Sequence, residues 1–136
     1  METITEINLV ALAVGAFVYF MLGALWFTPL FGKAYDDSLG FKRPKDYKWA
    51  PIFYWMPLAS SILTVALIAW LHATITPESV GGAMLLGAVV GLAGLSVSFN
   101  NAVTPNKPGP LLHGAVTGFY HLTASMLAAI VVHIVS

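Results

Sequence analysis

The sequence predicts an all-α fold, a bundle of four transmembrane helices with both termini on the outer side of the membrane. Hydrophobic residues make up 58% and charged residues 9% of the 136-residue chain, whereas soluble domains carry roughly 25% charged residues. The apolar residues gather in four runs, each close to the ~20 residues that a helix needs to cross a bilayer. All six Lys and Arg residues fall in the first and third connections between these runs. Because short cytoplasmic loops retain Lys and Arg, this asymmetry predicts an N-out, C-out, multi-pass protein of the inner (cytoplasmic) membrane.

The four spans belong to a single integral membrane domain, residues 1–136. We expect them at about residues 7–27, 52–73, 80–103 and 111–135. The cytoplasmic connections are then residues 28–51 and 104–110.

Several residues predict where these helices begin and end. Thr3 and Glu6 have the spacing of a capping box before the first span, and Pro29 is expected to end that span. Thr76, followed by a proline and an acidic residue, is expected to cap the third span. Pro57 lies inside the second span and predicts a kink near its cytoplasmic end.

The first connection is long enough to hold structure of its own. Between Leu30 and Phe41, apolar residues alternate with Lys33 and two aspartates, a mixture that predicts an interfacial half-helix on the inner leaflet. The cationic cluster that follows would lie beside anionic headgroups, each cation contributing about 1 kcal/mol. The cluster is either a topology signal alone or also a contact for anionic inner-leaflet lipids. The expected contact residues are Trp26, Phe31, Lys33, Lys42, Arg43, Lys45 and Lys48.

Composition argues against several classes of function. The chain has no cysteine, so it forms no disulfide, thiolate metal site or cysteine nucleophile. Its net charge of zero gives no basis for binding nucleic acid. No Asp, Glu, Lys or Arg falls in the centre of a span, which disfavours ion-coupled transport because such carriers place a charge at membrane depth. Without a hydrolase motif, we predict that the protein is not an enzyme and holds no cofactor or metal.

Small residues predict where the helices pack most tightly, because close approach drives helix association in lipid. The third span carries a stripe of small residues with a GxxxG motif, and the fourth span carries a second GxxxG motif. Whether these faces meet within one bundle or between protomers is open, and we expect a homo-oligomer. The packing residues are Ala83, Gly87, Gly91, Gly94, Ser98, Gly114 and Gly118, with Asn101 and Ser125 continuing the two faces.

Polar side chains toward the cytoplasmic ends of the third and fourth spans predict a shallow inward-facing pocket. His121, near the middle of the fourth span, falls beside the small-residue face on a helical wheel. It is either a neutral imidazole bonded to a neighbouring helix or a functional group, such as a proton relay or a ligand contact. The other groups either line the pocket or reach interfacial water. The predicted pocket residues are Asn100, Asn101, His113, Thr117, Tyr120 and His121.

His72 and His133 lie at matched depth near the outer face, on different spans. Two imidazoles can bind a metal or haem iron, but structural zinc usually has four ligands, and a haem needs facing rings across a cofactor-sized gap. Only the glutamates of the adjoining segments, Glu2, Glu6 and Glu78, could add ligands. We therefore predict no metal site here.

Residues Gly23 to Tyr35 read G-A-L-W-F-T-P-L-F-G-K-A-Y. This segment resembles the signature G-x-L-W-[FY]-[ST]-P-x-x-F-G-K-x-W of small bacterial membrane proteins grouped as domain of unknown function family 1761. Tyr35 stands where the signature has tryptophan. The resemblance implies an integral membrane protein and no established activity, so it assigns no catalytic residue.

Three classes of function remain. The first is a non-enzymatic component that acts through helix packing, oligomerisation or as an accessory subunit, which the small-residue faces favour. The second is a pore or carrier for a neutral or weakly polar solute, which would use the predicted polar pocket. The third is a binder of a lipid or of a haem or metal cofactor.

Overall fold

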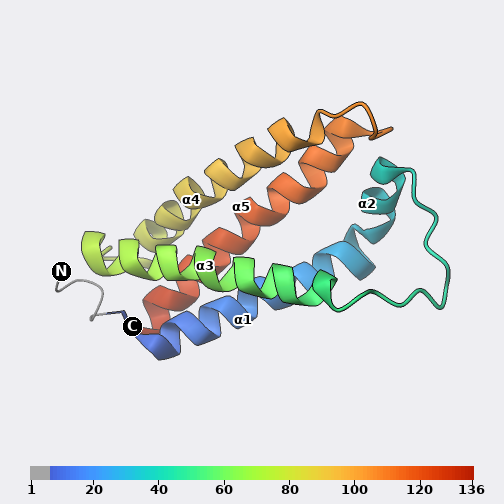
Figure 1. Cartoon of the computed structure of the whole chain (residues 1–136). Helices are drawn as coiled ribbons and strands as arrows, with labels where there is room; N and C mark the ends of the chain where they lie inside the picture. Colours follow the sequence, from blue (N-terminus) through green and yellow to red (C-terminus); the bar gives the residue numbers. More distant parts are fainter. Residues whose placement is uncertain (1–6) are drawn as a thin grey trace.

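The computed structural model describes residues 7–136, and all regular structure within them is helical. Its long helices are α1 (Leu9–Leu25), α3 (Ile52–Ile75), α4 (Val80–Ala102) and α5 (Pro110–Val135), with a short helix α2 (Gly32–Leu39) after α1 (Figure 1). A π-helical turn, η2 (Trp26–Leu30), extends α1, and each of the four long segments is long and apolar enough to cross a membrane. The predicted all-α bundle of four apolar helices is confirmed. Its orientation stays a prediction.

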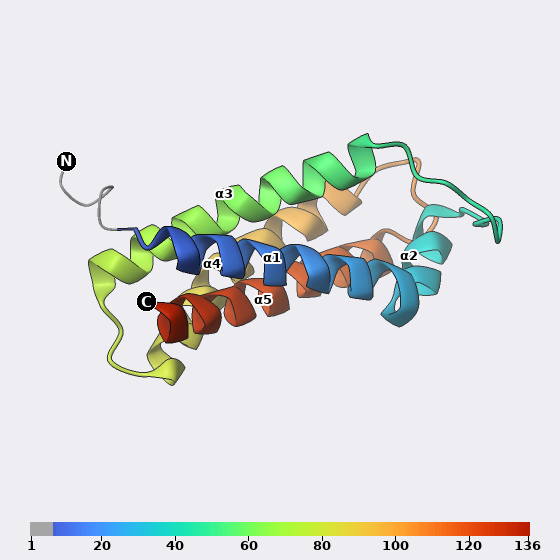
Figure 2. The ribbon, with the colours of Figure 1, turned by 90° about the horizontal axis from the view of Figure 1, so that it is seen from below.

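The connections between the helices gather at the two ends of the bundle (Figures 1 and 2). Helix α2, residues 40–51 and the α4–α5 connection lie at one end, whereas the C-terminus and the α3–α4 connection lie at the other. All six Lys and Arg residues belong to the first group of segments, which we call the cationic end.

Helix α1 begins after Asn8, whose side-chain oxygen accepts hydrogen bonds from the backbone N–H groups of Val10 and Ala11 at 2.9 and 3.1 Å. An asparagine at this position satisfies donors that have no partner within the helix. The capping box expected from Thr3 and Glu6 lies outside the described residues.

The prediction that Pro29 ends the first span was wrong, since the helix continues to Leu30 as the π-helical turn η2. Phe31 N donates to Trp26 O at 2.7 Å, a bond that passes over the proline, which has no N–H of its own. The Thr28 hydroxyl donates to Ala24 O one turn earlier. The wider turn therefore accommodates Pro29 and leads directly into α2, the predicted half-helix.

The expected cap of the third span was also wrong. Ser79, not Thr76, precedes α4, and its hydroxyl accepts a hydrogen bond from Gly82 N at 3.1 Å. Thr76 instead ends α3 in the left-handed conformation, with φ of 50°, and its N–H donates to His72 O at 2.8 Å. Because Thr76 is part of the C-terminal end of α3, it does not cap α4. Pro57 lies inside α3, and the Ser61 hydroxyl donates to Pro57 O at 2.7 Å. The kink expected at Pro57 stays a prediction.

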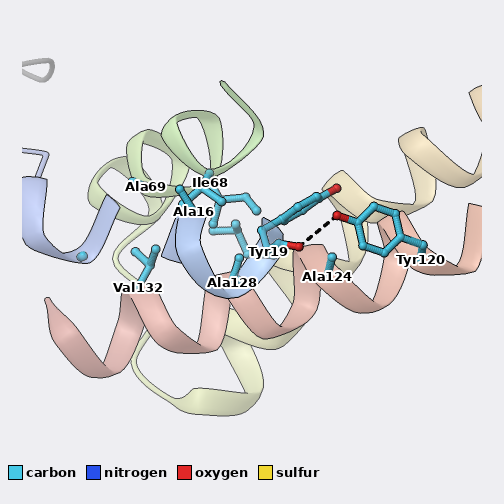
Figure 3. Close-up of a cluster of buried hydrophobic side chains, with 12 residues drawn as sticks. Ala16, Tyr19, Ile68, Ala69, Tyr120, Ala124, Ala128 and Val132 are labelled. Atoms are coloured by element: carbon cyan, nitrogen blue, oxygen red, sulfur yellow. Dashed lines mark hydrogen bonds between the residues drawn. The ribbon is translucent and has the colours of Figure 1, made fainter. Parts of the chain in front are cut away.

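The core lies where α1, α3 and α5 meet, and most of its residues are small (Figure 3). Alanines let the helix backbones approach closely, and dispersion between packed groups replaces the hydrophobic effect that is weak in lipid. The largest fully buried side chains of the core are Ile68, Val65 and Val132. The buried core residues are Ala11, Ala16, Tyr19, Val65, Ile68, Ala69, Leu86, Tyr120, Ala124, Ala128, Ala129 and Val132.

Helix α4 packs along α5 through its small residues. A Cβ atom on Gly87 would lie 2.8 Å from Met126 Cα, and one on Gly91 would lie 2.6 Å from Leu122 Cα. On the facing helix, a Cβ on Gly118 would lie 3.2 Å from Leu95 Cα. These small-residue faces thus meet within one chain. The far end of the stripe differs, because Asn101 is exposed.

A candidate binding cavity at the cationic end

A cavity of about 390 Å³ opens between α1, α3 and α5 and is partly covered by α2 and residues 40–51. Its walls combine aromatic rings with a few hydroxyl groups, one imidazole and one guanidinium group. The lining residues are Tyr19, Phe20, Gly23, Ala24, Phe27, Thr28, Tyr35, Arg43, Trp49, Phe53, Tyr54, Pro57, Ser60, Ser61, Thr117, Tyr120 and His121.

The inner wall of the cavity is held by hydrogen bonds between α1 and α5. The Tyr19 hydroxyl oxygen and His121 Nδ1 are 2.8 Å apart. The Tyr120 hydroxyl donates to Tyr19 O at 2.9 Å, the bond drawn in Figure 3. Each of these polar groups thus has a hydrogen-bond partner on the facing helix.

Two glycines provide the space that these rings occupy. A Cβ on Gly23 of α1 would lie 2.8 Å from the Tyr120 hydroxyl oxygen. A Cβ on Gly94 of α4 would lie 2.9 Å from His121 Cβ. A side chain at either position would displace Tyr120 or His121. The inner wall therefore requires glycine at both positions.

The mouth of the cavity is organised around Arg43. Its guanidinium donates to Asp36 Oδ1 at 2.8 Å and lies over the Trp49 ring, 4.8 Å from the ring centroid. The Arg43 side chain is only 22% exposed. Its Nε is buried and has no hydrogen-bond partner among the described residues. Tyr35 lies on the same wall, and burial together with the charge of Asp36 raises the pKa of its phenol, which keeps this group neutral.

The predicted pocket residues separate into two groups. Thr117, Tyr120 and His121 line the cavity. Asn100 and Asn101 are exposed and do not line it, because α4 packs mainly against α5 and away from this opening. His113 lies just outside the lining.

His113 instead attaches α2 to the start of α5. Its Nδ1 is 3.2 Å from the Ser38 hydroxyl oxygen, and its ring lies 5.4 Å from that of Tyr35. Gly109 N also donates to Ser38 O, at 3.1 Å. These contacts hold α2 over the cavity.

The predicted lipid-contact residues also occupy different places in the structure. The Trp26 indole donates to Val116 O at 2.9 Å, which joins η2 to α5, and its ring packs at a tilt against that of Phe31, with centroids 4.5 Å apart. Lys33 forms an exposed ion pair with Asp37 at 2.6 Å. Of the predicted set, only Arg43 lines the cavity, whereas Lys42, Lys45 and Lys48 are exposed in the segment beside its mouth.

His72 and His133 meet at the opposite end of the bundle, with His72 Nε2 3.1 Å from His133 Nδ1. Both line a second cavity, of about 570 Å³, which also touches Asn8 and Thr76. Within residues 7–136, no group of three or more His, Asp or Glu side chains is placed to hold a metal ion.

A comparison with known families identifies the chain. The model of the family described as "Protein of unknown function (DUF1761)" matches residues 10–133, from the first turn of α1 to the last turn of α5. The chain belongs to this family. No curated protein and no solved structure matches it significantly. The resemblance seen in residues 23–35 is thus confirmed, and the DUF1761 description assigns no activity.

Sequence reasoning missed several residues of the cavity in this DUF1761 protein. Tyr19 carried a usable signal, because a phenol in the middle of a span needs a partner in lipid. Asp36 carried none, since its pairing with Arg43 depends on how residues 40–51 fold back over α2. Ser61 carried none either, because its hydroxyl bonds its own helix backbone and the residue lines the cavity only through the packing of α3.

Proposed function

We propose that the protein is a membrane-embedded binding protein for a small anionic amphiphile. The apolar body of the ligand would lie among the rings of the cavity, and its anionic head would bind Arg43. The observation that carries this proposal is the composition of the cavity wall, in which Arg43 is the one Lys, Arg, Asp or Glu among the described lining residues. A volume of about 390 Å³ lies within the range of roughly 300–1,000 Å³ that is typical of small-molecule sites.

The state of Arg43 supports an anionic head group. Asp36 engages one end of the guanidinium, while the buried Nε has no partner among the described residues. An unsatisfied buried donor costs about 1–3 kcal/mol, which an acceptor oxygen of a ligand would offset. The planar guanidinium suits carboxylate and phosphate oxygens.

The charge around the mouth of the cavity also supports an anionic ligand. Residues 32–50 contain five Lys and Arg and three Asp, a surplus of two positive charges (five minus three). A surplus of this sign raises the local concentration of anions at the opening.

The structure favours a binding protein over a pore. Along α3 and α5, three fully buried side chains, Val65, Ile68 and Val132, lie between the residues that line this cavity and those that line the second one. The oligomeric function that the small-residue faces suggested loses that support, since Gly87, Gly91 and Gly118 are used within the chain. A homo-oligomer remains a prediction that rests on other surfaces.

Binding of cis-parinaric acid tests the proposal, because Trp49 lies in the cavity wall and can transfer excitation energy to this fluorescent fatty acid. We expect saturable transfer with purified protein in detergent. Ala24→Phe should abolish it by filling the cavity, whereas Ala13→Phe, an exposed position on the same helix, should not. Equal binding by both variants would contradict the proposed site.

The role of Arg43 is tested with the uncharged methyl ester of the same probe. Arg43→Gln should weaken binding of the acid by about 10- to 100-fold, as expected for loss of a charge-assisted hydrogen bond. It should leave binding of the ester nearly unchanged, and Arg43→Lys should restore part of the affinity for the acid. An equal loss for acid and ester would show that Arg43 shapes the cavity without binding an anion.

A further inference from the structure

The two imidazoles at the other end of the bundle form a cluster remote from the proposed amphiphile site. His72 lies in the last turn of α3 and His133 in the last turn of α5. Their facing nitrogens, Nε2 and Nδ1, are 3.1 Å apart, and the rings are inclined at 63°. Both rings line the cavity of about 570 Å³. The cluster thus combines two nitrogen ligands with open space beside them.

We propose that His72 and His133 bind a divalent transition-metal ion, of the Ni²⁺, Cu²⁺ or Zn²⁺ class, that joins α3 to α5. Two imidazole nitrogens on one ion, each at about 2.05 Å, are about 2.9 Å apart at a right angle and about 3.3 Å apart in a tetrahedron. The observed separation of 3.1 Å lies between these values. To bind one ion, the two rings would rotate so that both lone pairs point at it and no longer at each other.

The surroundings of the pair favour a cation. Both histidines lie at helix C-termini, where backbone carbonyls carry partial negative charge. All six Lys and Arg residues lie at the opposite end of the bundle, so none of them repels an ion here. The hydrogen bond between the two nitrogens requires a proton on one of them. On metal binding that imidazole would take its other tautomer, with the proton on the ring nitrogen that faces away from the ion.

The remaining coordination positions fall to water in the adjoining cavity. Asn8 also lines this cavity, but its side-chain oxygen already caps α1. Imidazole suits Zn²⁺, Cu²⁺ and Ni²⁺, and affinity follows the order in which Cu²⁺ binds most tightly. The proposal departs from the expectation of no metal, which rested on the lack of further protein ligands. It does not depend on the proposed amphiphile function.

Electron paramagnetic resonance of bound Cu²⁺ tests the site directly, because nitrogen hyperfine splitting counts the imidazole ligands. The full chain is purified through a tag without histidine and loaded with one equivalent of Cu²⁺ alone. We expect two coordinating nitrogens in the wild-type protein and in the control His113→Gln. We expect His72→Gln and His133→Gln each to lose one nitrogen and to bind more than about tenfold more weakly, since even outer partners of metal ligands affect affinity by 10–100-fold.

Thermal unfolding gives a second readout. Ni²⁺ or Zn²⁺ should raise the unfolding temperature of the wild-type protein and of His113→Gln, and a chelator should reverse the shift. Neither ion should stabilise His72→Gln or His133→Gln. A wild-type Cu²⁺ spectrum with one nitrogen, or with none, would overturn the proposal even if both variants failed to fold. A two-nitrogen spectrum unchanged in either folded variant would overturn it as well.

Discussion

At the scale of single residues, Tyr120 shows how one hydroxyl group joins two helices in this bundle. Its ring is buried on α5, and its hydroxyl donates to the backbone oxygen of Tyr19 on α1. Gly23 provides the space for that hydroxyl. The rings of Tyr19 and Tyr120 also meet edge to face, with centroids 5.5 Å apart. The Tyr120 hydroxyl group therefore stabilises the inner wall of the cavity by joining α5 to α1.

Tyr120→Phe removes this hydrogen bond while keeping the ring. We expect the variant to lose about 0.5–1.5 kcal/mol of unfolding free energy, the net contribution of such a bond. Unfolding in increasing SDS, followed by circular dichroism, measures the difference. Tyr47→Phe, at an exposed tyrosine, is the matched control and should change stability by less than about 0.5 kcal/mol. Equal stability of the two variants would contradict the structural role of the Tyr120 hydroxyl.

At the scale of elements, the α4–α5 pair is the most extensive helix contact among residues 7–136, and glycines in the contact face make it possible. Gly87 and Gly91 lie against the α5 backbone, so a methyl group at either position would meet main-chain atoms that cannot move aside easily. A Cβ on Gly81, in the first turn of the same helix, would meet only the Ser79 hydroxyl, at 3.8 Å. One helix thus contains both crowded and open glycines.

Gly87→Ala should separate α4 from α5 and destabilise the protein by about 1–3 kcal/mol, as overpacking generally does. Gly81→Ala should be neutral or slightly stabilising, because alanine is the better helix former and the position is open. Both variants can be compared by SDS unfolding and by size-exclusion chromatography. A harmless Gly87→Ala would show that α4 does not lie against α5 as described.

At the scale of the whole molecule, charge and shape divide the bundle into two unlike ends. The cationic end holds α2, the cavity proposed to bind an amphiphile and every Lys and Arg, while the other end holds the histidine pair and Glu78. We propose that the cationic end faces the cytoplasm, since Lys and Arg near membrane spans are retained there. The amphiphile site would then open toward the inner leaflet.

The natural absence of cysteine makes this orientation simple to test. Single variants Lys48→Cys and Glu78→Cys place one thiol at each end of the bundle. In intact cells, a membrane-impermeant maleimide should label only the Glu78→Cys protein, and both should react after the membrane is permeabilised. Labelling of Lys48→Cys alone in intact cells would reverse the proposed orientation.

The sequence by itself determined the four apolar helices, the short helix after the first of them and the small-residue faces of α4 and α5. These features are local, because each membrane helix satisfies its own backbone and its apolar length is read directly from the chain. Tertiary structure alone decided which side chains meet. Tyr19 and His121, and likewise His72 and His133, come together because of the rotation and tilt of separate helices. Asn100 and Asn101 turn away from the cavity for the same reason. The hydropathy of the sequence does not predict the rotation and tilt of the helices, since in lipid both are set by the packing of small side chains between helices.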